Sequence, residues 1–166
     1  MRRWLNSGLL LLAVLSVGFL GFRTLFPSPQ RVIRRQLVEM ARIASFDVNE
    51  SPLAKLANSQ KLGSYFADNV DVNLDIPGRG QQTFRGREEL IQVATGARTQ
   101  LSSLNIQLPD IAVIVASDGQ SAEVNATVNA NIGGQREMYV EELKFSLEKL
   151  HGDWLIHRIE PANTLR

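Results

Sequence analysis

The residues best suited to chemistry lie near the end of the chain, in the stretch "HGDWLIHRIEP" at positions 151–161. This stretch holds both histidines of the protein and one of its two tryptophans, together with an arginine and two acids. Histidine can act as a general acid or base near neutral pH, and carboxylates can share that work. The stretch is therefore either the working face of an active site or a hairpin that closes a β-sheet.

A metal site is not expected there. His151 and His157 are six residues apart, one in a predicted turn and one in a predicted strand, so their rings do not converge. The chain has no cysteine that could complete a ligand set or form a disulfide. Because the sequence also lacks a glycine-rich phosphate loop and a nucleophile elbow, we predict no metal and no cofactor.

The turn chemistry of this stretch sets which side chains face the core. Gly152-Asp153 fits a two-residue hairpin loop of type II′, which pairs His151 with Trp154. This register directs Trp154 inward and His157 outward, next to Glu148 on the preceding strand. A three-residue loop would instead turn His157 inward, because a shift of one residue moves a side chain to the opposite face.

On the type II′ register, the inward face of the closing hairpin carries polar side chains at its far end. Charged groups are rarely fully buried unless they are paired, so these residues either satisfy one another at a pocket rim or contact a ligand. Arg158 would anchor an anionic ligand, because its planar guanidinium binds carboxylates through two parallel hydrogen bonds. The predicted pocket residues are Tyr65, Tyr139, Glu141, Trp154, Arg158 and Glu160.

Helices are expected before this hairpin and strands around it. Cap-like residues and apolar residues at helical spacing predict helices that begin at Pro29, Pro52 and Arg87, the second ending near Ala67. Alternating apolar and polar residues predict a strand that ends near Ile76 and four more in the last part of the chain. The four are placed at 105–118, 121–132, 136–150 and 154–162. Helices followed by an antiparallel meander predict the α+β class.

The N-terminal segment 1–26 is predicted to be a membrane anchor. Residues 4–22 contain no charge and, at about 1.5 Å per helical residue, nearly match a hydrocarbon core about 30 Å thick. Two alternatives remain open, a cleaved signal peptide with Ser16-Val17-Gly18 as its small-x-small sequence, or a buried soluble helix. We expect residues 27–166 to form one α+β domain.

Charge is distributed unevenly between the two ends of the chain. Residues 1–46 hold seven arginines and one acid, whereas the rest holds eleven basic and sixteen acidic residues, so the two parts carry +6 and −5. This balance argues against a nucleic-acid-binding domain. The arginines near the anchor form either a solvated face or a surface for anionic lipid head groups. They are Arg23, Arg31, Arg34, Arg35 and Arg42.

The predicted topology follows from these charges. Arg2 and Arg3 precede the uncharged segment and compete with the arginines behind it for the cytoplasmic side. We expect a single-pass protein of a bacterial inner membrane, with its amino terminus inside and its domain on the periplasmic side.

The order of these elements resembles the nuclear transport factor 2-like superfamily, which includes SnoaL-like proteins and ketosteroid isomerases. The likeness covers roughly residues 30–163 and rests on two helices, the strand "FADNVDVNLDIPG", the helix start "TFRGREEL" and a meander closing on "GDWLIHRIEP". The resemblance implies a cone, in which a curved, mainly antiparallel mixed sheet wraps about three helices around an internal pocket. It also implies that the domain often forms dimers through the sheet.

The isomerases suggest one catalytic position. Their catalytic base is an aspartate directly before proline, and the similar stretch here is Asp75-Ile76-Pro77-Gly78, with Asp75 displaced by one residue. In a regular strand this displacement turns Asp75 to the polar face. The isomerases also use a tyrosine from their first helix, and residues 29–46 contain none. Asp75 and Glu141 are therefore weak catalytic candidates.

Three functions are compatible with these observations. The leading hypothesis is a membrane-anchored, non-catalytic domain that binds a small apolar or amphipathic ligand, or a partner protein, at the bilayer surface. The second is an isomerase or dehydratase for a small hydrophobic substrate, with Asp75 or Glu141 as base and Arg158 or Tyr139 as electrophilic support. The third is an assembly subunit that uses the Asn- and Thr-rich face of residues 121–132 as a dimer or partner surface.

Overall fold

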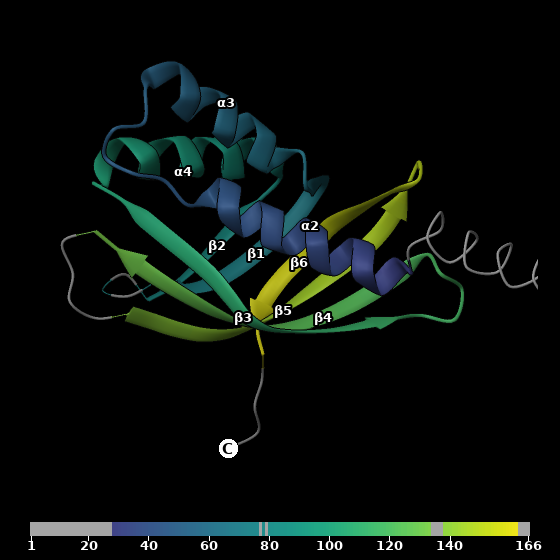
Figure 1. Cartoon of the computed structure of the whole chain (residues 1–166). Helices are drawn as coiled ribbons and strands as arrows, with labels where there is room; N and C mark the ends of the chain where they lie inside the picture. The colour runs from purple at the N-terminus through teal and green to yellow at the C-terminus, as the bar shows by residue number, and fades with distance from the viewer. Residues whose placement is uncertain (1–27, 77, 79, 134–137, 163–166) are drawn as a thin grey trace, which may run out of the picture.

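The computed structural model describes residues 28–76, 78, 80–133 and 138–162. Three helices pack on the concave side of one curved sheet (Figure 1). The helices are α2 (Pro29–Ala44), α3 (Pro52–Gly63) and α4 (Arg87–Gln100). The strands are β1 (Phe66–Ile76), β2 (Gly80–Arg85), β3 (Leu104–Val115), β4 (Ser121–Ile132), β5 (Met138–Leu150) and β6 (Asp153–Pro161). The predicted α+β class is confirmed.

The helix starts follow the local sequence. Proline occupies the first turn of both α2 and α3, where its missing N–H costs no hydrogen bond. The Ser51 hydroxyl accepts a hydrogen bond from the Ala54 N–H at 3.2 Å and so caps α3. Gly86 precedes α4 with a φ of 84°, a backbone conformation that favours glycine.

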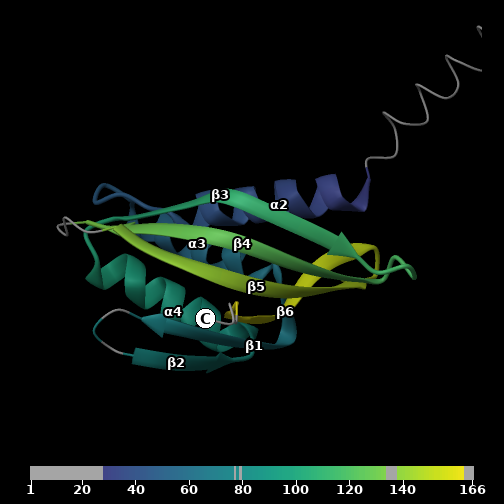
Figure 2. The ribbon, with the colours of Figure 1, turned by 90° about the horizontal axis from the view of Figure 1, so that it is seen from below.

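The sheet has the strand order β2-β1-β6-β5-β4-β3, so β2 and β3 form its edges (Figure 2). β1 and β6 run parallel, and every other neighbouring pair is antiparallel. The sheet is therefore mixed and mainly antiparallel, as the resemblance to the nuclear transport factor 2-like superfamily implied. Pro109 lies at an irregularity of the edge strand β3, where a missing N–H is tolerated.

The hydrophobic core lies between α2 and the middle of the sheet. Ile33 and Leu37 of α2 are fully buried, as are Leu147 of β5 and Ile156 of β6. Trp154 is also buried, which confirms its predicted inward orientation. The burial of apolar side chains such as these is the main source of folding free energy.

One predicted boundary was wrong. The second helix ends at Gly63 rather than near Ala67. Phe66 and Ala67 are buried at the start of β1, and Phe66 pairs with Ile156 of β6. This long-range pairing overrides the helical propensity of the sequence around residues 64–67.

The predicted turn of the closing hairpin was also wrong. Leu150 pairs with Asp153, so the loop consists of His151 and Gly152, not of Gly152-Asp153. His151 and Gly152 have φ values of 53° and 100°, so both central residues lie in the left-handed region, as in a type I′ turn. The pairing predicted between His151 and Trp154 is replaced by one between Lys149 and Trp154.

A β-bulge then changes the face of the last residues of β6. Leu147 pairs with Ile156 and Ser146 with Arg158, so His157 is the extra residue. Beyond the bulge, Ile159 faces the core and is buried, whereas Arg158 is exposed. The predicted inward orientation of Arg158 and Glu160 is therefore corrected, because one extra residue reverses the alternation of faces.

The predicted anchor, residues 1–26, lies outside the described residues. Over the part of the chain that the structure describes, no helix is long and apolar enough to span a bilayer.

Candidate active or binding site

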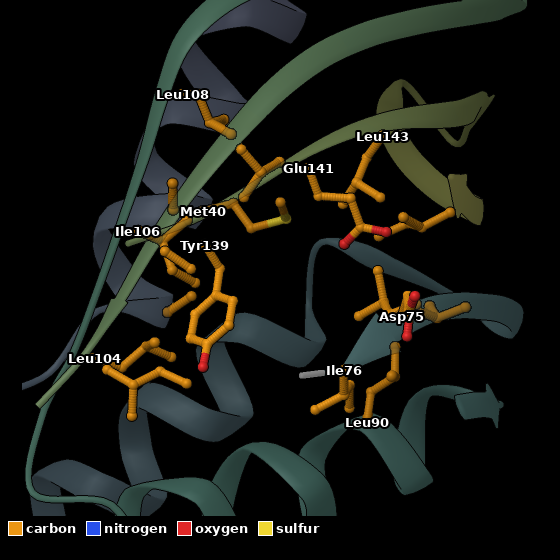
Figure 3. Close-up of a pocket in the computed structure, with 18 of the residues that line it drawn as sticks. Met40, Asp75, Ile76, Leu90, Leu104, Ile106, Leu108, Tyr139, Glu141 and Leu143 are labelled. Atoms are coloured by element: carbon orange, nitrogen blue, oxygen red, sulfur yellow. The ribbon is translucent and has the colours of Figure 1, made fainter. Parts of the chain in front are cut away.

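A pocket of about 850 Å³ opens between the helices and the concave face of the sheet (Figure 3). α2 and α4 contribute to its wall, together with β1, β3, β4 and β5. Nearly all of the lining is aliphatic, with side chains such as Leu74, Leu104, Ile106 and Leu108. Such a cavity, in which a few polar groups stand among many apolar ones, is typical of small-molecule sites.

Three polar side chains with chemistry to offer line this pocket: Asp75, Tyr139 and Glu141. Tyr139 and Glu141 alternate with Val140 along β5, and Val140, which also contributes to the lining, is 60% exposed whereas the other two are half-buried. The strand period of two therefore directs Tyr139 and Glu141 inward beside Leu143. Their place at the pocket agrees with the sequence prediction for these two residues.

Asp75 lies where a regular alternation would not place it. It is exposed and neighbours Leu74 and Ile76, yet all three residues line the pocket. Asp75 lies one residue from the end of β1, next to the edge strand β2, where the pocket reaches the surface. Its carboxylate is thus a rim group of the pocket, reachable both from water and from a ligand.

Glu141 and Asp75 interact at this rim. In Figure 3 the two carboxyl groups lie on the same side of the pocket. Burial raises the pKa of Glu141 above its usual range, and the negative charge of Asp75 raises it further, although a backbone hydrogen bond from Asp75 opposes the rise. The pocket therefore holds one acid with a raised pKa beside a second acid.

Tyr139 occupies a different part of the pocket. In Figure 3 its ring extends away from the two acids, and its hydroxyl points toward the side on which Leu104 lies. The phenol hydroxyl and the Glu141 carboxylate therefore point to different parts of the pocket. Catalysis by enolisation needs a base and an electrophilic donor that reach the same substrate.

The remaining predicted pocket residues lie elsewhere. Trp154 is 4% exposed in the core. Glu160 pairs with Lys144 at 2.9 Å and with Arg158 at 3.7 Å. Tyr65 lines a separate small depression beside α2, with Arg35 and Glu39 among its neighbours.

The two histidines do not form a site. His157 lies 3.8 Å from the Glu148 carboxylate, which confirms the predicted outward orientation and its partner. His151 lies in the turn. Within the described residues no group of three or more histidine, cysteine or acidic side chains is arranged to hold a metal ion.

The described basic residues of the predicted lipid-facing surface lie along α2. Arg31, Arg34, Arg35 and Arg42 are exposed. Two of them also have partners, since Arg34 donates to the carbonyl oxygen of Ile111 and Arg42 forms an ion pair with Glu39 at 2.7 Å. Arg23 lies outside the described residues.

A buried polar cluster beneath α4 was missed by the sequence reasoning. Arg98 is 1% exposed and donates hydrogen bonds to the Glu50 carboxylate at 2.6 and 2.7 Å, and another to the carbonyl oxygen of Ile43. Its guanidinium also lies over the Phe46 ring, 5.0 Å from the ring centroid. Helical spacing could have found it, because Arg98 follows Ile91 by seven residues and so shares the inner face of α4.

Comparison with known proteins gives a fold but no close relative. No family model and no curated protein matches the sequence. Among solved structures, a provisionally assigned scytalone dehydratase from Novosphingobium aromaticivorans matches with a TM-score of 0.59 and 17% identity, covering 79% of this chain and 80% of that chain. Yeast Ubp3-associated protein Bre5 matches with a TM-score of 0.61 and 15% identity, covering 81% and 95%.

A third structure carries the name of the fold. It is a nuclear transport factor 2-like protein of unknown function from Pseudomonas putida, with a TM-score of 0.58, 14% identity and coverage of 77% of this chain and 82% of that chain. At these identities the likeness shows the fold alone, and the fold hosts many functions. The chain therefore has the nuclear transport factor 2-like fold that the order of its helices and strands predicted.

Proposed function

We propose that this domain binds a small, largely apolar molecule in the pocket described above. The observation that carries the proposal is the pocket itself, an aliphatic cavity of about 850 Å³ with Glu141 and Asp75 at its rim. A filled core would contain no such space, because protein interiors pack about as densely as organic crystals. The aliphatic wall supplies affinity by burying apolar surface of the ligand, and the rim acids orient its polar end.

Mass spectrometry of small molecules that co-purify with the full-length protein tests this function. The wild type is expected to carry one class of hydrophobic molecule that a Val128→Phe variant lacks, since Val128 lines the pocket. Val48→Phe is the matched control, because Val48 is 70% exposed and does not line the pocket. Equal ligand content in all three proteins would contradict the proposal.

The proposal extends to the bilayer surface. It is supported by the uncharged stretch at residues 4–22 and by the exposed arginines of α2, which begin at Arg31, nine residues after that stretch. An anchored pocket would exchange hydrophobic molecules with the membrane beside it. If alkaline carbonate washing released the full-length protein from membranes, the anchor would be ruled out.

A second candidate function is acid–base catalysis on a hydrophobic substrate. Its specific support is that both Asp75 and Glu141 line the pocket and that Glu141 has a raised pKa. Incubation with cyclic ketones in D₂O would detect it as deuterium uptake next to the carbonyl group. Uptake that Glu141→Gln abolishes would establish catalysis, whereas uptake equal to that of buffer would exclude it for these substrates.

A homodimer formed through the sheet stays a proposal. Its support is the outer face of β5, where Met138 and Val140 are 55% and 60% exposed. Exposed apolar side chains on a sheet are typical of protein interfaces. Light scattering of the full-length protein in mild detergent would test this, and a strictly monomeric mass would contradict it.

A further inference from the structure

The pocket described above has an unusual balance of charge. Its described lining contains two carboxylates, Asp75 and Glu141, and no lysine, arginine or histidine. The sequence had predicted the opposite, with Arg158 as an anchor for an anionic ligand. The bulge at His157 removes that anchor by turning Arg158 to the outer face of the sheet.

Four basic side chains that the structure describes pair with groups other than the two acids of the pocket. Arg158 and Lys144 pair with Glu160 on the outer face. Arg87 donates to the carbonyl oxygen of Phe66 and pairs with Asp68 at 2.8 Å. Arg98 is held by Glu50 under α4. None of these four cations therefore neutralises the acids at the rim.

Among the residues that the structure describes, no cation forms an ion pair with Asp75 or Glu141. Two carboxylates that share a site oppose each other's ionisation, and partial burial opposes it further. A cation placed between them would relieve both effects, whereas an anion would add a third negative charge. The rest of the wall is aliphatic, so it favours a hydrocarbon body.

We propose that the pocket selects hydrophobic amines, with an aliphatic body in the cavity and one protonated amino group between Glu141 and Asp75. This inference rests on the proposed ligand-binding function and specifies its ligand class. An ammonium donates up to three hydrogen bonds and can therefore contact both carboxylates. Fatty acids and other anionic amphiphiles are disfavoured by like charge, and alcohols of the same length bind through the hydrocarbon alone.

A matched set of three ligands tests the proposal: octylamine, octanol and octanoate. Their binding to the full-length protein in nanodiscs of neutral phosphatidylcholine would be measured by calorimetry at pH 7. A Val128→Phe variant, whose pocket is filled, provides the signal due to partition into the bilayer. Octylamine is expected to bind about tenfold more tightly than octanol, because a charge-assisted hydrogen bond typically contributes that much, and octanoate is expected to bind least.

Three variants identify the groups responsible. Glu141→Gln and Asp75→Asn are each expected to lower octylamine affinity about tenfold and to leave octanol affinity nearly unchanged. Glu142→Gln is the matched control, because Glu142 is the next residue of β5 and points to the opposite, exposed face. Glu142→Gln removes the same charge from the protein and should change the affinity for neither ligand.

The outcomes separate this inference from the function on which it rests. If octanol binds the wild type and not the filled variant but octylamine binds no better, the pocket is real and the amine proposal is overturned. If octanoate binds most tightly, the amine proposal is likewise overturned. If no ligand exceeds the signal of Val128→Phe, the proposed binding function fails as well.

Discussion

Two glutamates of this domain are partly buried, but their pKa values shift in opposite directions. Glu50, between α2 and α3, accepts hydrogen bonds from Arg98 and from Asn58. Burial opposes its ionisation, but these bonds outweigh burial and hold the pKa of Glu50 below its usual range. Glu141, at the pocket rim, faces a second acid, and its pKa is raised.

The difference separates a structural carboxylate from one suited to a ligand. Glu50 receives its positive charge and its hydrogen bonds from residues of its own chain. These interactions join α4 to the segment between α2 and α3, and we call this the closed region. Glu141 lies beside an open cavity, and the charge that acts on its pKa is the negative charge of Asp75. Perturbed acids with an unfavourable neighbour often mark functional sites. Four predictions follow this contrast from its largest expected effect to its smallest.

Removing the cation from the closed region should have the largest effect. Arg98→Met leaves the Glu50 carboxylate buried without its partner, which typically costs about 3–5 kcal/mol of unfolding free energy. Denaturant unfolding of the full-length protein in mild detergent measures this loss. Arg42→Met is the control, because the ion pair of Arg42 with Glu39 is exposed and should contribute little. Equal losses in the two variants would contradict a structural role for the buried pair.

Enlarging a side chain should distinguish the open region from the filled core. Val124 and Val128 lie on the same face of β4, but Val124 is fully buried in the core whereas Val128 lines the pocket. Val124→Phe should lose about 1–3 kcal/mol of unfolding free energy through overpacking. Val128→Phe should lose less than about 1 kcal/mol, because its ring enters empty space. The same unfolding experiment compares the two, and a larger loss for Val128→Phe would show that the pocket is closed in solution.

The two glutamates should show opposite dependences of stability on pH. The folded pKa of Glu50 is lowered, so its contribution is present above its unfolded pKa of about 4.3 and is lost as the pH falls through the folded value. The folded pKa of Glu141 is raised, so its contribution is present below about pH 4.3 and is lost as the pH rises through the folded value.

The matching variants are Glu50→Gln and Glu141→Gln. Glu50→Gln should cost about 1–3 kcal/mol at neutral pH, and this deficit should shrink in acid. Glu141→Gln should instead be more stable than the wild type at neutral pH, and this gain should vanish in acid. Unfolding curves recorded between pH 3 and pH 8 give both trends. Parallel trends for the two variants would remove the contrast between the two acids.

The smallest effect is expected from Asp75→Asn. Removing the negative charge of Asp75 should lower the pKa of Glu141, although burial still keeps it above the usual range. The unfolding free energy should change by no more than about 0.5 kcal/mol, because Asp75 is exposed. Carboxyl ¹³C chemical shifts, followed over a pH titration, report the pKa directly. An unchanged pKa would mean that the two acids do not interact, and Glu142→Gln should leave it unchanged in any case.

Much of the fold could be predicted from local patterns. Apolar residues at helical spacing and proline near the start place α2 as observed, and alternation of apolar with polar residues places β4 from Ser121 to Ile132 as predicted. The same alternation directs Tyr139 and Glu141 of β5 into the concave side. These features depend on residues within one or two turns or on the period of a strand, so the sequence shows them directly.

The closing hairpin could not be predicted at the same level. Both Gly152-Asp153 and His151-Gly152 offer a glycine to a two-residue loop, and the observed turn also places His151 at a φ of 53°. The bulge at His157 has no local sequence signal that we recognise. It arises where β6 must pair with β5 on one side and with the parallel strand β1 on the other. That double pairing decides which way Arg158 points.

The sequence by itself determined the α+β class, the order of the elements, the inward face of β5 and the uneven charge of the two ends of the chain. Only the tertiary structure decided where α3 stops, that Arg98 and Glu50 pair beneath α4, and that the pocket carries two acids in place of an arginine. The physical reason is that each of these outcomes depends on partners distant in sequence. Propensity and periodicity describe a segment alone, whereas burial and charge pairing are set by what the other segments bring to it.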